Sequence, residues 1–430
     1  MRYVLSSKIY SVERKRFRTV NPAVISAKES PALNLSGRIP QLDGLRGLAI
    51  LFVILCHYVG NPNHAPLGFW PHRFLSAFTV GWSGVDLFFV LSGFLIGGIL
   101  LDARNSPHYF RAFYMRRVFR ILPIYYLWTL LFAATVIGAL VFFPGRLGVT
   151  TGELLRVPVQ LLFLQNFWPG MLRFTWMWFA VTWSLAVEEQ FYLIAPPLIR
   201  YLSRPVMIRL LASVLFIAPV LRFFVFRYLP NGSVAAVFLM PCRADALSCG
   251  ILLALAFRDA RFLEFFRHHS TYLHRILFAL FLGIGGLLWW LVHPMNTVTV
   301  TIGFTWLAFF YSALLLTVVS QPAGWLATVT RWRFLSWLGG VSYCVYLLHD
   351  AFNFFAHMIF FHSEPRLYTL SHLAVSALAL LATFGVASLS WRFFEKPLIR
   401  RGHSYSYDEA TAPPSVLERG ECSSSGVARP

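Results

Sequence analysis

The chain has 430 residues, of which 57% are hydrophobic and only 13% are charged. Soluble domains carry about 25% charged residues, so this composition excludes an ordinary soluble globular protein. The net charge of +19 would favour a nucleic-acid ligand in a soluble protein, but membrane proteins collect basic residues on their cytoplasmic loops. We therefore interpret the charge as a topology signal and expect no nucleic-acid partner.

Ten apolar stretches approach or exceed the length of about 20 residues that a helix needs to cross a bilayer. They are Leu45–Val59, Val80–Leu101, Ile121–Phe143, Trp176–Ile199, Val206–Tyr228, Val234–Phe257, Arg275–His293, Val298–Ser320, Phe334–Phe361 and Leu370–Phe394. The first is short, but the preceding IPQLDGL segment can extend it. A further apolar stretch, Leu154–Phe167, is broken by Pro158 and predicts an interfacial or re-entrant segment. The sequence therefore predicts an all-α polytopic membrane protein with about ten transmembrane helices.

The distribution of basic residues predicts the orientation of these helices. A cytoplasmic N-terminus places about three quarters of the 37 basic residues on the cytoplasmic side, and an even number of crossings makes both termini cytoplasmic. Residues 1–38 form a basic, Ser-rich tail without the apolar run of a signal peptide. Residues 401–430 have the polar composition typical of disordered segments. The membrane domain is expected between them, at residues 39–400.

Ionisable side chains inside membrane helices are costly and therefore mark candidate functional sites. Arg46 and His57 are 11 positions apart in the first helix, so they share nearly one face and lie about 16 Å apart along its axis. Asp86 lies one turn inside the second helix, where it either interacts with the helix dipole or takes part in the chemistry. The fourth helix carries the adjacent carboxylates Glu188 and Glu189, which cannot share one face.

Two later helices also carry ionisable residues. In PCRADALSCG, Arg243 and Asp245 can pair with each other or with partners across the bundle. In VSYCVYLLHD, His349 and Asp350 lie just past the midpoint of their helix. The predicted helix directions bring these groups to the middle or outer half of the bilayer, which indicates a polar cavity open to the non-cytoplasmic side.

The cytoplasmic side carries a different kind of cluster. In RAFYMRRVFRILP, Arg117 and Arg120 are three positions apart and share a helix face, on the same side of the membrane as Arg46. The guanidinium group is planar and rigid and binds phosphate through two parallel hydrogen bonds, which favours a phosphate-bearing ligand. The same residues can instead anchor the helix and bind the headgroups of anionic membrane lipids. The five cysteines show no CxxC or Cys/His spacing, so we expect no metal site and no disulfide framework.

Seven motifs in order along residues 39–400 make the chain similar to a known family. They are IPQLDGLRGLAILFVILCH, GVDLFFVLSGFLI, RRVFRILPIYYL, WSLAVEEQFYL, CRADALSCGILLA, SYCVYLLH and WRFFEKPLIRR. The chain resembles the acyltransferase 3 family of membrane acyltransferases, many of which O-acylate sugars of bacterial surface polysaccharides. The family's Arg-x10-His pattern falls on Arg46 and His57, its Arg-x2-Arg pattern on Arg117 and Arg120, and its helix-four Glu on Glu188.

The resemblance implies a multi-pass enzyme of the bacterial inner (cytoplasmic) membrane. It implies transfer of an acyl group, most simply acetyl, from cytoplasmic acyl-CoA to a hydroxyl of a sugar in a cell-surface or lipid-linked glycan. Arg46, Arg117 and Arg120 would then bind the CoA phosphates. His57 would be the general base or a nucleophile that briefly carries the acyl group. Glu188 or Asp86 would orient its imidazole.

The competing hypothesis is a proton-coupled secondary transporter of a sugar, a lipid or a small anion. Intramembrane His, Glu and Arg residues also build proton pathways. Many transporters consist of two related halves, however, and this sequence has no clear internal repeat. Binding of CoA or acyl-CoA from the cytoplasmic face distinguishes the two hypotheses, since only the acyltransferase requires it.

Overall fold

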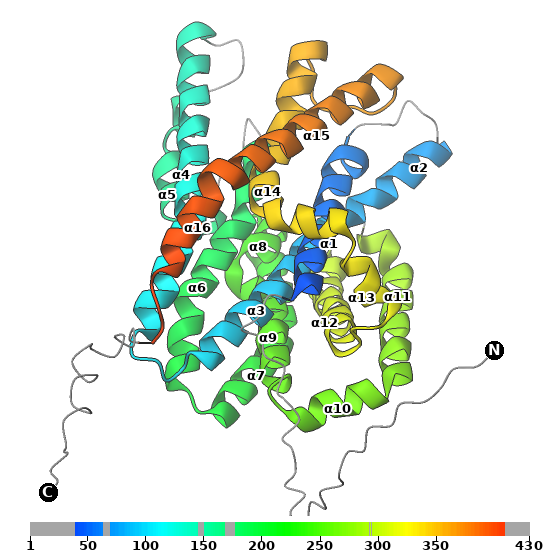
Figure 1. Ribbon diagram of the computed structural model, residues 1–430. Coiled ribbons are helices and arrows are strands. Elements are labelled where there is room, and N and C mark those ends of the chain that lie inside the picture. Colours follow the sequence, from blue (N-terminus) through cyan, green and yellow to red (C-terminus); the bar gives the residue numbers. More distant parts are fainter. Residues whose placement is uncertain are drawn as a thin grey trace, which may run out of the picture.

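The computed structural model describes residues 39–62, 69–144, 150–167, 177–291, 293 and 295–408. Helices form the whole architecture of these residues, and they contain no β-strand (Figure 1). The predicted N-terminal tail and the part of the predicted C-terminal tail from residue 409 onward lie outside the described residues. The described chain nevertheless continues past residue 400, because the last helix ends at His403.

The helices follow one another in chain order with short connections. They are α1 Pro40–Leu55, α2 Phe69–Ala77, α3 Gly84–Asp102, α4 Tyr109–Phe142, α5 Arg156–Leu161, α6 Trp183–Tyr201, α7 Arg204–Tyr228, α8 Gly232–Phe238, α9 Met240–Ala256, α10 Ala260–His268, α11 Ser270–Leu291, α12 Phe304–Ser320, α13 Trp325–Thr330, α14 Arg333–Phe361, α15 Leu370–Ser390 and α16 Lys396–His403. Proline occupies the first turn of α1, α7, α9 and α16, where its fixed φ suits a helix start and its missing N–H costs no hydrogen bond.

Among the described residues, nine helical stretches are long and apolar enough to cross a bilayer. They are Pro40–Gly60, His72–Asp102, Tyr109–Phe142, Arg204–Tyr228, Gly232–Ala256, Ser270–Leu287, Thr299–Ser320, Arg333–Phe361 and Leu370–His403. Each corresponds to one predicted span, and the first begins at Pro40, as the IPQLDGL extension predicts. The remaining predicted span corresponds to α6, which has 19 residues but carries two adjacent glutamates and two prolines. The all-helical, polytopic architecture is confirmed, while ten crossings stay a prediction.

Small residues allow the central helices to approach closely. A Cβ atom on Gly250 of α9 would overlap the carbonyl oxygen of Val90 in α3, and one on Gly93 would overlap that of Leu247. A Cβ on Gly339 of α14 would likewise overlap the carbonyl oxygen of Asp43 in α1. Because lipid supplies no hydrophobic drive between membrane helices, such close backbone packing is a main source of their association.

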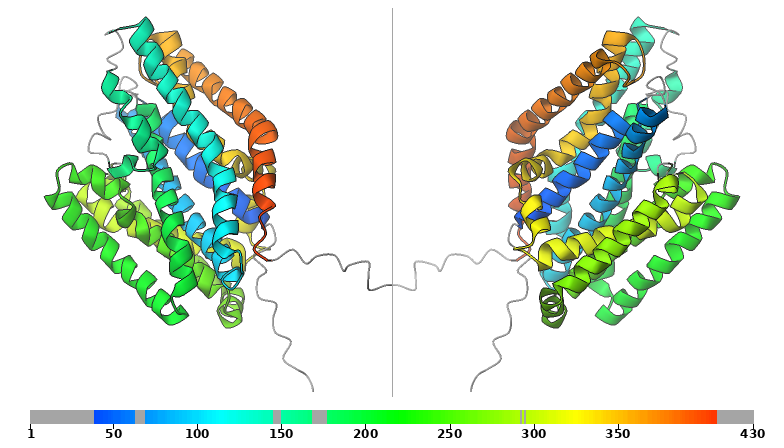
Figure 2. Two further views of the ribbon diagram at one scale, coloured as in Figure 1. Left: turned by 90° about the vertical axis from the view of Figure 1, so that its left-hand side faces the viewer. Right: turned by 90° about the vertical axis from the view of Figure 1, so that its right-hand side faces the viewer.

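The start of α1 lies beside the start of α14, and the start of α4 lies beside the end of α16; we call this region the basic end (Figure 2). Gly44 of α1 packs against the backbone of Thr330, just before α14, and the Arg116 side chain of α4 donates to the carbonyl of Tyr405, just after α16. The end of α3 belongs here too, since α3 ends at Asp102 and a short connection leads from it to the start of α4 at Tyr109. This arrangement gathers the arginines of α1 and α4 in one place.

Candidate active site

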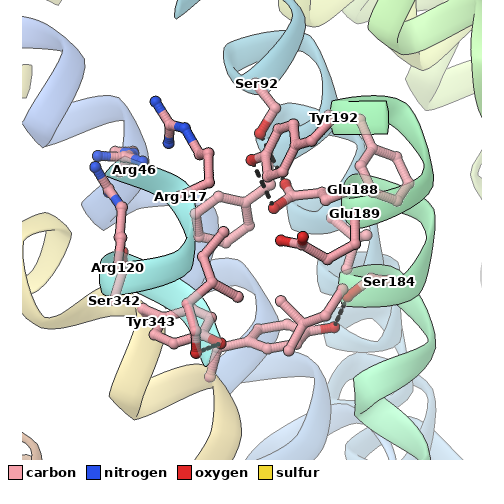
Figure 3. A pocket seen from close by; sticks show the side chains of 16 residues that line it. Arg46, Ser92, Arg117, Arg120, Ser184, Glu188, Glu189, Tyr192, Ser342 and Tyr343 are labelled. Carbon is pink, nitrogen blue, oxygen red and sulfur yellow. Dashed lines mark hydrogen bonds between the residues drawn. The ribbon is translucent and has the colours of Figure 1, made fainter. Parts of the chain in front are cut away.

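A small cavity of about 80 Å³ opens among α1, α3, α4, α6 and α14, and we call it the basic cavity. Arg46 of α1 lines it together with Arg117 and Arg120 of α4. Glu188 and Glu189 of α6 line it from the side opposite Arg46 and Arg120 (Figure 3). The structure therefore brings together the three predicted donor-binding arginines and the predicted catalytic glutamate, although they come from three helices.

The three arginines of the basic cavity form no ion pair with any described carboxylate. Arg117 instead lies over the rings of Phe113 and Tyr192, at 5.6 and 5.5 Å from their centroids. Arg46 and Arg120 interact electrostatically with each other, and their guanidinium groups lie together in Figure 3. Guanidinium groups that are held together without direct counter-ions form a strong site for an anion such as a phosphate.

Glu188 is fixed by hydroxyl groups. Ser92 of α3 donates a hydrogen bond of 2.8 Å to its Oε1, and the Tyr192 hydroxyl donates one of 3.3 Å to its Oε2 (Figure 3). The carboxylate is thus held at the wall of the basic cavity, and among the described residues it forms no hydrogen bond with His57. The catalytic role of Glu188 stays a prediction.

A second cavity of about 540 Å³ contains His57, and we call it the large cavity. It is lined by polar groups, among them Asp350 and Arg243, and by aromatic rings that include Trp82, Trp183 and Phe304. Val85 and Tyr346 line both cavities, so the two spaces meet at these two side chains. The 11-residue spacing therefore places Arg46 in one cavity and His57 in its neighbour.

The local backbone fixes the tautomer of His57. After Leu55, α1 continues as a π-helical turn, Cys56–Gly60, a feature that is frequent at functional sites. His57 Nδ1 lies 2.9 Å from the carbonyl oxygen of Val53. Because a carbonyl only accepts, Nδ1 carries the proton of the neutral ring, and Nε2 keeps its lone pair. His57 is therefore set up to accept a proton at Nε2.

His349 of α14 is the aromatic neighbour of His57, with ring centroids 4.8 Å apart and planes at 79°. His349 is fully buried, and its Nδ1 lies 2.8 Å from the carbonyl of Tyr346. The next residue, Asp350, lines the large cavity and interacts electrostatically with His57. The sequence shows these residues as a polar group in an apolar helix, but it does not show which helix they face.

Asp86 has a partner other than His57. It forms a buried ion pair of 2.5 Å with Arg243 of α9, whose guanidinium also lies 3.8 Å from the centroid of the Phe304 ring. Asp245 pairs in turn with Arg222 of α7 at 2.9 Å. Arg243 and Asp245 thus pair across the bundle, which is one of the two arrangements predicted. Arg243 therefore binds Asp86 Oδ1, no hydrogen bond joins Asp86 to His57 among the described residues, and the catalytic role of Asp86 stays a prediction.

The fold and the site together define a polytopic helical membrane protein in which three arginines and two glutamates line one cavity and a histidine lines the next. The comparison with protein families is specific. The acyltransferase domain of the acyltransferase 3 family matches residues 39–392, so the chain belongs to this family. No solved structure matches the chain. Among the described residues, no group of three His, Cys, Asp or Glu side chains is placed to hold a metal ion.

Several curated proteins are similar to the chain. YrhL of Bacillus subtilis, provisionally named a peptidoglycan O-acetyltransferase, is 29% identical over 85% of this chain and 55% of its own length. The peptidoglycan O-acetyltransferase OatA of Listeria monocytogenes is 26% identical over 85% of this chain and 56% of its own. SACOL0978 of Staphylococcus aureus, provisionally named an O-acetyltransferase, is also 26% identical, over 85% and 58%. The chain therefore spans little more than half the length of these relatives.

Proposed function

We propose that the protein is a membrane O-acetyltransferase that moves an acetyl group from cytoplasmic acetyl-CoA to a sugar hydroxyl of a cell-surface or lipid-linked glycan. The observation that carries this proposal is the pair of adjoining cavities, with Arg46 in one and His57 in the other. One helix thereby joins a site for the donor's phosphates to a site for chemistry. A rise of about 1.5 Å per residue separates them by about 16 Å, a distance that suits the extended pantetheine arm.

The donor end of the proposal rests on Arg46, Arg117 and Arg120. Their guanidinium groups line one cavity and form no ion pair with the described carboxylates, so their N–H groups could donate hydrogen bonds to a CoA pyrophosphate. A thioester has no charge and can enter the bundle, whereas the phosphates cannot leave the arginines without losing these contacts. The CoA head would therefore stay at the basic end while its acyl group approaches Val85 and Tyr346.

The chemistry would take place at His57. Its Nε2 would remove the proton of the acceptor hydroxyl, and the hydroxyl oxygen would attack the thioester carbonyl. The C–O bond then forms, the C–S bond breaks, and the proton passes from His57 to the CoA thiolate. In the alternative, Nε2 attacks the carbonyl, the C–S bond breaks and CoA leaves as the thiolate; the acceptor hydroxyl then attacks the acetyl-imidazolium, the C–N bond breaks, and the hydroxyl proton neutralises the thiolate. In both cases, the Asp350 carboxylate stabilises positive charge on the ring.

Glu188 and Asp86 receive supporting roles in this proposal. Glu188 would hold the hydroxyls of Ser92 and Tyr192 at the wall of the basic cavity. Asp86 would fix Arg243, which lines the large cavity and can bind polar groups of the acceptor. Both residues would thus act as positioning groups, and His57 would be the group that touches the reacting atoms.

The large cavity is the proposed acceptor site. Its volume of about 540 Å³ lies within the usual range of ligand sites, and its wall combines aromatic rings with a few charged groups, including Asp350 and Glu364. Aromatic faces suit the C–H faces of a sugar ring, and the polar groups suit its hydroxyls. The names of YrhL and OatA, which refer to peptidoglycan, also support a glycan of the cell envelope.

The proposed orientation places the basic end in the cytoplasm of a cell with an inner membrane. The clustering of arginines at the starts of α1 and α4 supports this orientation, since basic residues are retained on the cytoplasmic side. Ten crossings, with α6 as one of them, would then make both termini cytoplasmic. Anionic membrane lipids would surround the exposed arginines of this end.

Donor binding tests the proposal directly. The full chain in nanodiscs is titrated with CoA and acetyl-CoA, and the wild type is compared with Arg46→Ala and Arg120→Ala. The matched control is Arg209→Ala, which removes an exposed arginine of α7 outside both cavities. Saturable binding that only the two cavity substitutions weaken supports the proposal. A folded wild type that binds no short acyl-CoA contradicts it and favours the transporter hypothesis.

A further inference from the structure

Residues 404–408, which follow α16, fold back over the start of α4. The Arg116 side chain donates a 3.0 Å hydrogen bond from Nε to the carbonyl oxygen of Tyr405. The backbone N–H of His108 donates to the carbonyl oxygen of Tyr407 at 3.3 Å. The segment is thus tied to α4 at two points at the basic end, next to the turn that carries the cavity arginines.

Guanidinium groups and aromatic rings alternate in this region, which we call the Tyr-Arg patch. The Arg116 guanidinium lies 4.6 Å from the centroid of the Tyr407 ring, and that of Arg111 lies 5.6 Å from the Tyr405 ring. Arg111 is exposed and both tyrosines are half-buried, so part of each ring is open to a ligand. Burial raises the pKa of the Tyr407 phenol, which therefore stays neutral and keeps its O–H as a hydrogen-bond donor.

The patch adjoins the basic cavity through a single turn of α4. Arg116 contacts the patch, while the next residue, Arg117, lines the cavity. At about 1.5 Å per residue, Arg111 lies about 13 Å along the helix from Arg120, on the side away from His57. A ligand that extends from the cavity towards the end of the bundle would therefore meet the Tyr-Arg patch next.

The basic cavity is too small for a whole CoA molecule. Its volume is about 80 Å³, whereas sites for ligands of drug size usually measure about 300–1,000 Å³. The nucleotide of CoA carries a planar adenine and a third phosphate, on the ribose 3′ oxygen. Exposed arginine binds such a phosphate with two hydrogen bonds, and the alternating rings and guanidinium planes can stack on the base. A lipid headgroup offers the phosphate but no planar ring.

From these contacts we propose that Arg111, Arg116, Tyr405 and Tyr407 bind the 3′-phosphoadenosine moiety of the acyl-CoA donor. This inference rests on the proposed function, because it assumes that CoA binds at the basic end. It adds a second recognition site to the donor, outside the basic cavity. The arginines of the basic cavity bind the pyrophosphate, and the Tyr-Arg patch binds the adenine and the 3′-phosphate.

The test compares CoA with 3′-dephospho-CoA, using the full chain in nanodiscs of phosphatidylcholine alone. The wild type is expected to bind CoA about tenfold or more tightly than the dephospho form, as one charge-assisted phosphate contact allows. Arg111→Ala is expected to abolish this preference, because it lowers the affinity for CoA about tenfold more than the affinity for 3′-dephospho-CoA. Tyr405→Leu should weaken both ligands, and Tyr405→Phe, which keeps the ring, should restore them. Arg209→Ala serves as the matched control.

The outcomes separate this inference from the proposed function. If the wild type binds neither ligand, the donor site itself is wrong. If the wild type binds both ligands and Arg111→Ala keeps the full preference for the 3′-phosphate, only the Tyr-Arg patch is refuted. A further series adds phosphatidylglycerol to the discs: if Arg111→Ala alters lipid association but not the CoA preference, the patch is a headgroup site and the inference is overturned.

Discussion

The ion pair between Asp86 and Arg243 allows a sharp test of what Asp86 does. Both side chains are at most 2% exposed, and the remaining nitrogens of Arg243, Nε and Nη1, have no hydrogen-bond partner among the described residues. Asp86→Leu therefore leaves a buried guanidinium with no anion in contact. Breaking a buried pair in this way costs about 3–5 kcal/mol, because the desolvation of the remaining charge is no longer offset. We expect Asp86→Leu to lower the free energy of unfolding by that amount.

The double variant Asp86→Leu/Arg243→Met is the decisive control. It removes both charges and keeps an apolar side chain against Phe304, which lies 3.8 Å from the Arg243 guanidinium in the native protein. Replacing both members of a buried pair is often neutral, so we expect recovery to within about 1 kcal/mol of the wild type. The assay is reversible unfolding in mixed micelles for the wild type, the single variant and the double variant. An Asp86→Leu protein as stable as the wild type would refute the structural role of the pair.

Three further predictions follow from the site and the packing. His57→Ala should abolish acetyl transfer yet leave CoA affinity unchanged, as measured by labelled transfer and by titration; near-normal turnover would disprove its role. Tyr346→Ala should open the wall between the cavities and raise hydrolysis of acetyl-CoA without acceptor, whereas Tyr346→Phe should not; equal hydrolysis by both would contradict this. Gly250→Leu should lower the free energy of unfolding by about 1–3 kcal/mol or more, because the new side chain overpacks the contact between α3 and α9. Gly285→Leu, at a site with open space, should leave it nearly unchanged in the same unfolding assay.

The helices were predictable because the bilayer imposes their length and composition. Any crossing segment must satisfy its own backbone hydrogen bonds and present apolar side chains over about 20 residues. The same length argument predicted that the IPQLDGL segment extends the first helix, and α1 begins at Pro40. The case of α6 shows the limit of the approach: its glutamates and prolines lower its apolar character, so length and composition alone do not establish it as a crossing.

The partners of the polar residues were less predictable than their positions. Spacing along one helix places Arg46 and His57 on a face, but it does not fix how that helix is rotated against α3 or α14. That rotation depends on the close backbone contacts at glycines such as Gly47 and Gly339, which lie on different helices. The sequence consequently indicated Asp86 as a neighbour of His57, whereas the packed bundle pairs Asp86 with Arg243 and brings His349 to the imidazole.

The wall between the two cavities links the packing to the proposed chemistry. Tyr346 donates a 2.9 Å hydrogen bond to the carbonyl of Val181 and shares a 2.6 Å hydrogen bond with Ser184, so α14 is fixed to α6 at the point where the cavities meet. In the proposed reaction, a thioester that carries its acyl group from the arginines to His57 would have to pass this ring and Val85. A wall of this kind admits an uncharged acyl chain more readily than a hydrated ion. The same two side chains would therefore let the acetyl group through and keep the charged CoA head at the basic end.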